Sequence, residues 1–129
     1  MNGLSTMGEN TFLTGATGFV GSAVARALLA KGHALRVLAR PKSDRRNLEG
    51  LDIEIIEGDF TQPNTYRNAL RNCRNLLHVA ADYRIWVPDI SSMNRVNIDG
   101  TRALMLAAFD AGIERIVYTS SVATLGIHK

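Results

Sequence analysis

The residues best suited to chemistry are three glycines at regular spacing, Gly15, Gly18 and Gly21. They lie where an apolar run ends and a helical pattern begins. Gly15 permits a tight turn, Gly18 lets the backbone approach a pyrophosphate, and Gly21 permits close packing of a helix on a strand. The free N–H groups and positive dipole of the helix start would face the phosphates. The spacing predicts a phosphate-binding loop, with a glycine-rich turn that binds nothing as the alternative.

A basic residue stands at the end of the second apolar run, where NAD-preferring folds carry a carboxylate for the ribose 2′-hydroxyl. Ala39 and Arg40 occupy this place, and an arginine can bind a 2′-phosphate through a forked, charge-assisted contact. Lys42, Arg45 and Arg46 are close enough in sequence to add charge. The pattern favours NADP over NAD. A solvated surface arginine, or one that stacks on adenine and accepts both cofactors, is the alternative.

Strand and helix patterns alternate along the chain and would position these residues. Strands are expected at 11–14, 34–39, 53–57, 76–81 and 116–120, and helices at 19–31, 61–71 and 93–111. Such alternation predicts parallel strands with right-handed crossovers and helices on both faces. The fold class is therefore α/β, a doubly wound parallel sheet in the order 3-2-1-4-5, known as a Rossmann fold. Residues 1–10 are expected to form an N-terminal extension and 11–129 the nucleotide-binding domain.

Three details of the predicted helices can be checked. Residues Val20, Val24, Ala27 and Leu28 share one face of the first helix. Thr61 is expected to cap the second helix, which has a proline in its first turn. The third helix has apolar residues on most sides, which predicts that it is well buried.

Composition narrows the class of protein. The chain has 129 residues, 46% of them hydrophobic, and a net charge of +3, which suits one folded domain. Without a long Lys/Arg run, nucleic-acid binding is not expected. Cys73 is the single cysteine, so neither an internal disulfide nor a cysteine metal site is expected. No apolar run reaches the roughly 20 residues of a membrane span, and we expect a cytoplasmic protein by default.

The glycine spacing, preceded by Thr14, resembles the fingerprint of the extended short-chain dehydrogenases/reductases. Further segments match that family in order: Gly58-Asp59-Phe60, His78-Val79-Ala80-Ala81, Asn97-Ile98-Asp99-Gly100-Thr101 and Tyr118-Thr119-Ser120-Ser121. The resemblance covers residues 11–126. Within the family the chain is most similar to dihydroflavonol-reductase-like and hopanoid-associated sugar epimerase proteins, because of residues 44–48, 78–83 and 120–126.

The resemblance implies a cofactor site. Its residues would be Gly15, Thr17, Gly18, Phe19, Val20, Gly21, Arg40, Asp59, Phe60, Val79, Ala80 and Ala81. Asp59 would accept a hydrogen bond from the adenine amino group, or else cap the following turn. Phe60 would cover the adenine ring, and the small residues after the fourth strand would leave room for ribose and diphosphate. Asn97 would tie the third helix to that strand.

The same resemblance implies hydride transfer at a hydroxyl or carbonyl carbon of a nucleotide-sugar or similar small molecule. Ser121 would orient the reacting oxygen, with Ser120 as the alternative if the register slips by one residue. The family's Tyr-x-x-x-Lys pair is not found, since Tyr66, Tyr83 and Tyr118 have no lysine four residues later. We therefore expect the chain to end before the catalytic pair and the substrate domain, and to be inactive alone.

Two other classes of protein share parts of this pattern. A non-catalytic NADPH-binding or redox-sensing module of the same fold is the main alternative to an enzyme. A methyltransferase also has a glycine-rich strand–helix turn, but it usually carries an acidic residue at the position of Ala39.

Other residues give weaker predictions. The strand at 116–120 would form an apolar sheet edge, which predicts marginal stability and aggregation or a homodimer through that edge. His33 is expected to be a solvated turn residue and His78 a packed one. Tyr83, Arg84 and Trp86 could equally line a sugar pocket or cover the sheet edge.

Overall fold

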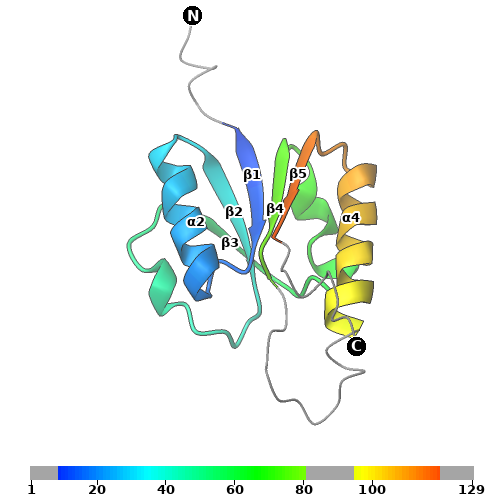
Figure 1. Ribbon diagram of the computed structural model, residues 1–129, viewed down its shortest axis with the longest axis horizontal. Helices are drawn as coiled ribbons and strands as arrows, with labels where there is room; N and C mark the ends of the chain where they lie inside the picture. The colour runs from blue at the N-terminus through cyan, green and yellow to red at the C-terminus, as the bar shows by residue number, and fades with distance from the viewer. Residues whose placement is uncertain (1–8, 81–94, 120–129) are drawn as a thin grey trace, which may run out of the picture.

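A five-stranded parallel sheet forms the middle layer of the molecule, which is seen in a computed structural model that describes residues 9–80 and 95–119. The strands are β1 (Asn10–Thr14), β2 (Ala34–Ala39), β3 (Glu54–Glu57), β4 (Asn75–His78) and β5 (Arg115–Tyr118), in the order β3-β2-β1-β4-β5. Helix α2 (Phe19–Ala30) covers one face and α4 (Thr101–Asp110) the other (Figure 1). The predicted fold class and strand order are confirmed.

Each face of the sheet has its own hydrophobic core. Successive strand side chains point to opposite faces, so Phe12 packs in the core beneath α4 with Leu76 and Leu104. Leu13, the next residue, packs in the core beneath α2 with Ala25. Both cores lie against β1, which pairs with β2 on one side and β4 on the other. The central strand is therefore buried on both faces.

Helix α2 ends one residue earlier than predicted, and only part of its predicted apolar face packs against the core. It ends at Ala30, and Gly32 follows with a φ of +86°, as a glycine after a helix end does. Its buried residues are Gly21, Ser22 and Ala25, whereas Val20 is 54% exposed. Val24 and Leu28 of the predicted apolar face pack against the core beneath α2, whereas Val20 and Ala27 are exposed because the small residues Gly21, Ser22 and Ala25 make the closest approach to the sheet.

The segment expected to be a helix at 61–71 instead forms two short 3₁₀ helices, η2 (Pro63–Thr65) and η3 (Arg67–Leu70). Tyr66 separates them. Its ring is 1% exposed within the core, and its hydroxyl donates a hydrogen bond to the carbonyl of Phe60 at 3.0 Å. Burial raises the pKa of Tyr66 to about 12. The helical prediction was wrong because Tyr66 is buried in the core, and the chain departs from a continuous α-helix at this residue to place it there.

Arg36 on β2 supplies the hydrogen bonds that end η3. Its Nη1 donates to the carbonyl oxygens of Ala69 at 2.9 Å and Arg71 at 2.8 Å. The same nitrogen lies 3.8 Å from the Sγ of Cys73, a buried free thiol whose pKa is raised by burial. A strand side chain thus satisfies carbonyls that a longer α-helix would have satisfied itself.

The helix expected at 93–111 is described from residue 95. A π-helical segment, η4 (Arg95–Gly100), leads into α4. Leu104 is fully buried, but Leu106 is 60% and Phe109 is 81% exposed. The prediction of burial on most sides was therefore wrong, because only one face of α4 meets the sheet.

A buried hydrogen-bond network joins β1, β4 and α4 at one end of the sheet. The Oγ1 of Thr14 accepts the backbone N–H groups of Val79 and Ala80, each at 3.1 Å. Because both lone pairs are used, the hydroxyl must donate its proton to Nδ1 of His78, which lies 2.7 Å away. The Nε2–H of His78 then donates to Oγ1 of Thr101 at 3.0 Å. The network therefore selects one neutral tautomer of His78.

Aromatic packing surrounds the same histidine. The His78 ring stacks on Tyr118 of β5 at 5.5 Å and meets the edge of Phe60 at 4.9 Å. His78 is 1% exposed, and this burial lowers its pKa to about 4. The packed histidine predicted from the sequence is confirmed. His33 is different from the prediction, because it is half-buried and its Nδ1 lies 2.8 Å from the Thr11 hydroxyl.

Acid should destabilise the protein through His78 before its carboxylates titrate. The folded-state pKa lies near 4 and the unfolded value near 6.5. The unfolded chain therefore binds a proton first as pH falls, and stability that is complete above 6.5 is lost on the way down to about 4. About 2 kcal/mol should be lost by about pH 5. Urea unfolding between pH 4 and 6.5 should show that the free energy of unfolding falls with pH in the wild type and does not fall in this way in His78→Asn. The same pH dependence in both proteins would rule out His78 as its source.

Candidate functional site

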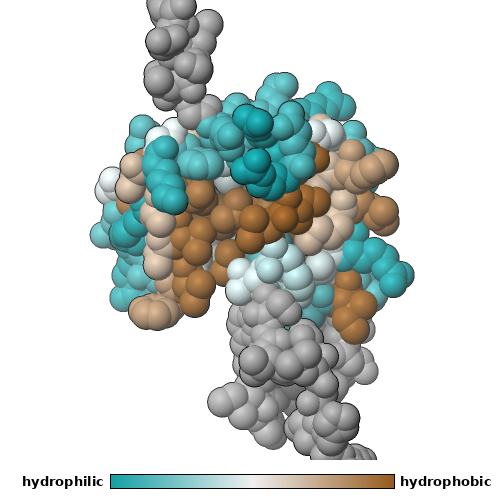
Figure 2. All heavy atoms as spheres, turned by 45° about the horizontal axis from the view of Figure 1, so that its top comes forward, coloured by the Kyte–Doolittle hydropathy of each residue, from teal (hydrophilic) through white to brown (hydrophobic). Residues whose placement is uncertain are grey.

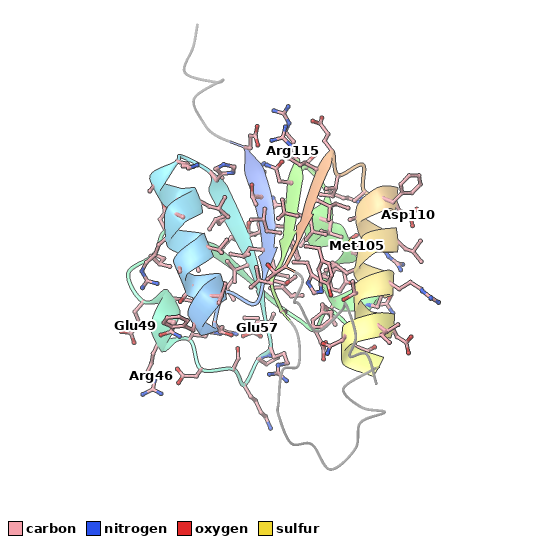
Figure 3. The ribbon with its side chains drawn as sticks, in the orientation of Figure 1. Arg46, Glu49, Glu57, Met105, Asp110 and Arg115 are labelled. Atoms are coloured by element: carbon pink, nitrogen blue, oxygen red, sulfur yellow. The ribbon has the colours of Figure 1, made fainter. Side chains whose placement is uncertain are left out.

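The candidate site lies at the carboxyl ends of the strands, where the chain order reverses between β1 and β4. Ligands of open parallel α/β sheets bind at such a switch point. Figure 3 shows this end of the sheet on the side of Glu57, which ends β3, with Arg115 at the opposite end of the molecule. The turn from β1 into α2, residues 15–18, lies directly at the switch.

Gly15 of this turn and Gly21 in the first turn of α2 are required by the protein itself. Gly15 has a φ of +80°, and a Cβ on it would lie 2.6 Å from the backbone nitrogen of Ala80. A Cβ on Gly21 would lie 1.8 Å from the carbonyl oxygen of Gly15. The turn is thus packed against the end of β4 on one side and the first turn of α2 on the other. Any side chain at either position would displace backbone.

Gly18 has no such requirement. A Cβ there would meet only the carbonyl oxygen of Gly15, at 3.5 Å, which is ordinary contact. Its φ of −82° and ψ of 177° are accessible to any residue, so neither the backbone conformation nor the packing at this position requires glycine. Gly18 is exposed at the N-terminus of α2, and no described side chain caps that helix. The absence of a Cβ leaves room for a group outside the protein.

The start of α2 is exposed as well as uncapped. Phe19 is 90% and Val20 54% exposed, although both are large and apolar. The helix N–H groups that precede the first intrahelical bond, from Ser22 to the carbonyl of Gly18 at 3.0 Å, point out of the helix. Unsatisfied donors, the positive helix end and nearby apolar side chains suit a ligand that carries both phosphate and ring groups.

The glycine turn is also held from the β2–β3 connection, which the sequence did not reveal. The Nδ2 of Asn47 donates to the carbonyl oxygen of Thr17 at 2.9 Å. Asn47 lies in the 3₁₀ helix η1 (Arg46–Leu48), whose Leu48 is buried in the core beneath α2. The bond spans 30 residues and joins two turns, so no local pattern could have indicated it.

The basic residues after β2 divide into paired and unpaired ones. Arg45 binds Glu57 at 2.9 Å, and Arg46 binds Asp44 at 2.6 Å. Within residues 9–80 and 95–119, Arg40 and Lys42 form no ion pair, and Arg40 is exposed just beyond the buried end of β2. Of the four cations predicted to add positive charge, two are therefore offset by carboxylates.

Asp59 stands at the end of β3, close to the same edge. Its Oδ1 accepts hydrogen bonds from the backbone N–H of Thr61 at 2.9 Å and from the Thr61 hydroxyl at 2.8 Å. The Thr65 hydroxyl in turn accepts the N–H of Asp59 at 3.0 Å. Asp59, not Thr61, thus caps the turn that follows β3. This is the alternative role considered for it, and it occupies one carboxylate oxygen.

The remaining predicted residues fall into two groups. Val79 and Ala80 lie against the glycine turn with their N–H groups bound to Thr14, and Phe60 packs on His78. Asn97 lies in η4. The others lie outside the described residues: Ala81, Tyr83, Arg84, Trp86, Ser120 and Ser121.

The glycine turn, the uncapped start of α2 and the strand order are together typical of a nucleotide-binding domain of the Rossmann type. In the described parts of the chain, no group of three or more His, Cys, Asp or Glu side chains could hold a metal ion. None of the described helices is long and apolar enough to cross a membrane.

Comparison with known proteins places this domain in a family. Residues 11–129 match the model of the NAD dependent epimerase/dehydratase family, and the chain belongs to that family. It is 42% identical over 121 residues to a putative dihydroflavonol 4-reductase of Synechocystis sp., and 42% identical over 118 residues to sterol demethylase protein B of Methylococcus capsulatus. An NAD-dependent glucose-6-phosphate dehydrogenase of Haloferax volcanii is 34% identical over 125 residues.

Solved structures of similar proteins share this fold. The crystal structure of gox2253 is 55% identical, with a TM-score of 0.86 over 94% of this chain. A short-chain dehydrogenase/reductase superfamily protein from Agrobacterium tumefaciens with bound NAD is 32% identical, with a TM-score of 0.73 over 88% of this chain. The chain spans 35% and 36% of the two curated relatives, and 37% and 33% of these two structures. About a third of each relative's length is therefore represented here.

Alanine should separate the two kinds of glycine in the turn. Gly21→Ala should lower the free energy of unfolding by at least about 2 kcal/mol, because its Cβ overlaps the Gly15 carbonyl. Gly18→Ala should change it by less than about 1 kcal/mol, since alanine restricts the unfolded chain but is a poorer helix N-cap than glycine, and the two effects oppose each other. Urea unfolding of both variants measures this. A large loss in Gly18→Ala would mean that the fold itself needs this glycine.

Proposed function

We propose that this chain binds the adenosine and diphosphate portion of NAD(P) for an oxidoreductase or epimerase that acts by hydride transfer. The observation that carries the proposal is Gly18, where no atom of the described residues requires glycine and no described side chain caps the start of α2. A pyrophosphate lying against that backbone would accept the free N–H groups and benefit from the helix dipole. Gly15, Thr17, Phe19, Val20 and Gly21 complete the phosphate loop.

Arg40 favours NADP within this proposal. Its guanidinium is exposed and unpaired among the described residues, and no carboxylate stands directly at the end of β2, where Ala39 and Arg40 lie. Lys42 adds a second unpaired cation, whereas Arg45 and Arg46 have carboxylate partners. The fork of Arg40 suits a terminal phosphate better than a neutral ribose hydroxyl. NAD would still fit, as it does in the related Agrobacterium protein.

The adenine ring would lie between the ends of β2 and β3. Asp59 would accept the adenine amino group with the oxygen that Thr61 does not occupy. Phe60 would contribute backbone N–H and apolar contact, and Val79, Ala80 and Ala81 would border the ribose and diphosphate. This arrangement lets Asp59 cap its turn and bind the ligand at once.

The chemistry proposed for the whole protein follows from its relatives. Reductases and UDP-glucose 4-epimerases are among the proteins that resemble this chain, so the substrate would carry a hydroxyl or carbonyl carbon, as a nucleotide-sugar does. NAD(P) would supply or accept the hydride. Ser121 would orient the substrate oxygen, in a soluble, cytoplasmic protein. The chain alone, without a Tyr-x-x-x-Lys pair, would bind cofactor but not turn over substrate.

Removing the Arg40 side chain should reduce NADP preference. Arg40→Ala should weaken NADPH binding by about 1.5–3 kcal/mol, the usual range for a hydrogen bond to a charged group, or roughly tenfold to a hundredfold. NADH binding should change little, because NADH has no 2′-phosphate. Calorimetric titration of both cofactors measures the difference.

Two variants make that titration decisive. Arg46→Ala is the matched control, since Arg46 is already bound to Asp44 and its loss should matter less. Gly18→Ala should weaken NADH and NADPH alike, because its methyl group would meet the diphosphate that both share. If Gly18→Ala binds NADH and NADPH with wild-type affinity, the phosphate-loop proposal fails. If Gly18→Ala weakens both cofactors but Arg40→Ala binds NADPH with wild-type affinity, only the NADP preference fails.

The serine assignment can be tested in a protein that includes this chain and a Tyr-x-x-x-Lys pair. Ser121→Ala should lower kcat well below that of Ser120→Ala while leaving cofactor affinity unchanged, since a group that orients the oxygen acts mainly in the transition state. Steady-state kinetics and cofactor titration supply both readings. Greater damage from Ser120→Ala would exchange the two roles. Normal turnover in both would favour a non-catalytic binding module.

A further inference from the structure

Glu57, the last residue of β3, places a carboxylate beside the end of β2. It is the register partner of Ala39, and the N–H of Gly58 donates to the carbonyl oxygen of Ala39 at 2.9 Å. Neighbouring strands lie about 4.8 Å apart, so this carboxylate stands one strand away from the position where NAD-preferring folds carry theirs. Figure 3 shows Glu57 at the same end of the molecule as the start of α2. A negative charge therefore borders the place proposed for the adenosine ribose.

The side chain of Glu57 lies on the same face of the sheet as α2. Alternate residues of a strand point to the same face, and Ile55, two residues earlier, packs on the core beneath α2. The loop after β2 returns to this face as well, because Leu48 is buried in that core. An ion pair between Glu57 and Arg45 joins the strand end to the loop. The carboxylate and the cations of the loop thus lie together at one edge of the candidate site.

Glu57 engages only one nitrogen of Arg45. The Nη2 of Arg45 lies 2.9 Å from Oε1 of Glu57, while its Nε is buried without a hydrogen-bond partner among the described residues. The strongest arginine–carboxylate pairs use two parallel N–H groups instead. A single contact to a carboxylate side chain that is 58% exposed contributes little, so another anion can compete for the arginine. A phosphate that accepts two N–H groups of one guanidinium would be such a competitor.

The loop after β2 keeps Arg45 close to Arg40. The backbone N–H and the hydroxyl of Ser43 both donate to the carbonyl oxygen of Arg40, at 3.0 and 2.7 Å, which closes a tight turn. Arg45 follows two residues later, and its ion pair holds it at the end of β3. Two arginines therefore flank the ends of β2 and β3. Arg40 forms no ion pair among the described residues, and Arg45 is neutralised by Glu57.

We propose that Glu57 is a specificity-determining residue, which limits the preference for NADP by competing with the 2′-phosphate for Arg45. In the free protein the carboxylate neutralises this arginine. NADP must break the ion pair to gain a second arginine, whereas NAD, which has no 2′-phosphate, leaves the pair intact. This role of Glu57 rests on the proposed cofactor site. It makes the strength of NADP selection depend on a residue of β3 as well as on the cations that follow β2.

Removing the charge of Glu57 tests the competition. Glu57→Gln keeps the length of the side chain and should lower the dissociation constant of NADPH about tenfold, because Arg45 gains a charged hydrogen bond with no ion pair to break. The dissociation constant of NADH should change by less than about twofold. Calorimetric titration measures both cofactors, and circular dichroism confirms that the variant is folded.

Glu54→Gln is the matched control. Glu54 begins the same strand and forms the same kind of ion pair, with Arg36 at 2.9 Å. It lies at the opposite end of the sheet, where the parallel strands begin and where Figure 2 shows a largely hydrophilic surface. Loss of its charge should therefore leave the dissociation constants of NADH and NADPH unchanged.

A second background separates competition from simple repulsion. In Arg45→Ala, which has no cation to release, Glu57→Gln should improve NADPH binding by only about twofold. An equal gain with and without Arg45 would overturn the proposal, as would wild-type NADPH affinity in Glu57→Gln or the same gain in Glu54→Gln. These outcomes leave the cofactor site standing. A wild type that binds neither cofactor would overturn the site and the role of Glu57 together.

Discussion

The hydroxyl of Thr14 is the contact on which the arrangement of the site depends. It accepts two backbone N–H groups from the chain after β4 and donates to His78, so all of its hydrogen-bonding capacity is used. The amides of Val79, which is buried, and Ala80, which is half-buried, lie beyond the end of β4 and would otherwise lack a protein partner. Because they are held, β4 ends against Gly15, and the glycine turn has a fixed wall. His78 extends the same network to Thr101 at the start of α4.

Much of the fold could be predicted because it follows from patterns local in sequence. The bounds of β2 follow from its apolar run, and the order of the five strands follows from the doubly wound fold class that the alternation of strand and helix patterns predicts. The helix predicted at 61–71 was wrong because the conformation there depends on the burial of Tyr66 and on hydrogen bonds from Arg36 of β2. The prediction that the third helix is buried on most sides was wrong for a related reason, because apolar residues on several sides of α4 do not indicate which side packs on the sheet.

The site was predictable to a similar degree. Glycine spacing locates the turn, but it does not distinguish Gly21, which the packing requires, from Gly18, which it does not. The basic run after β2 is visible in the sequence, whereas the pairing of Arg45 with Glu57 depends on how β2 and β3 align. Asn47 was missed because its partner, the carbonyl of Thr17, is a backbone group that could belong to any residue.

The bond between Asn47 and Thr17 has a consequence for how such a protein could change its cofactor. Residues 40–46 would be the natural target for redesign, because they contain the exposed cations after β2. The same connection also braces the glycine turn through Asn47. A loop exchanged over residues 40–47 would replace the charges and remove the brace together. Such an exchange must therefore preserve Asn47 and its spacing from Leu48, or the glycine turn will lose the hydrogen bond that holds it while the charges beside it change.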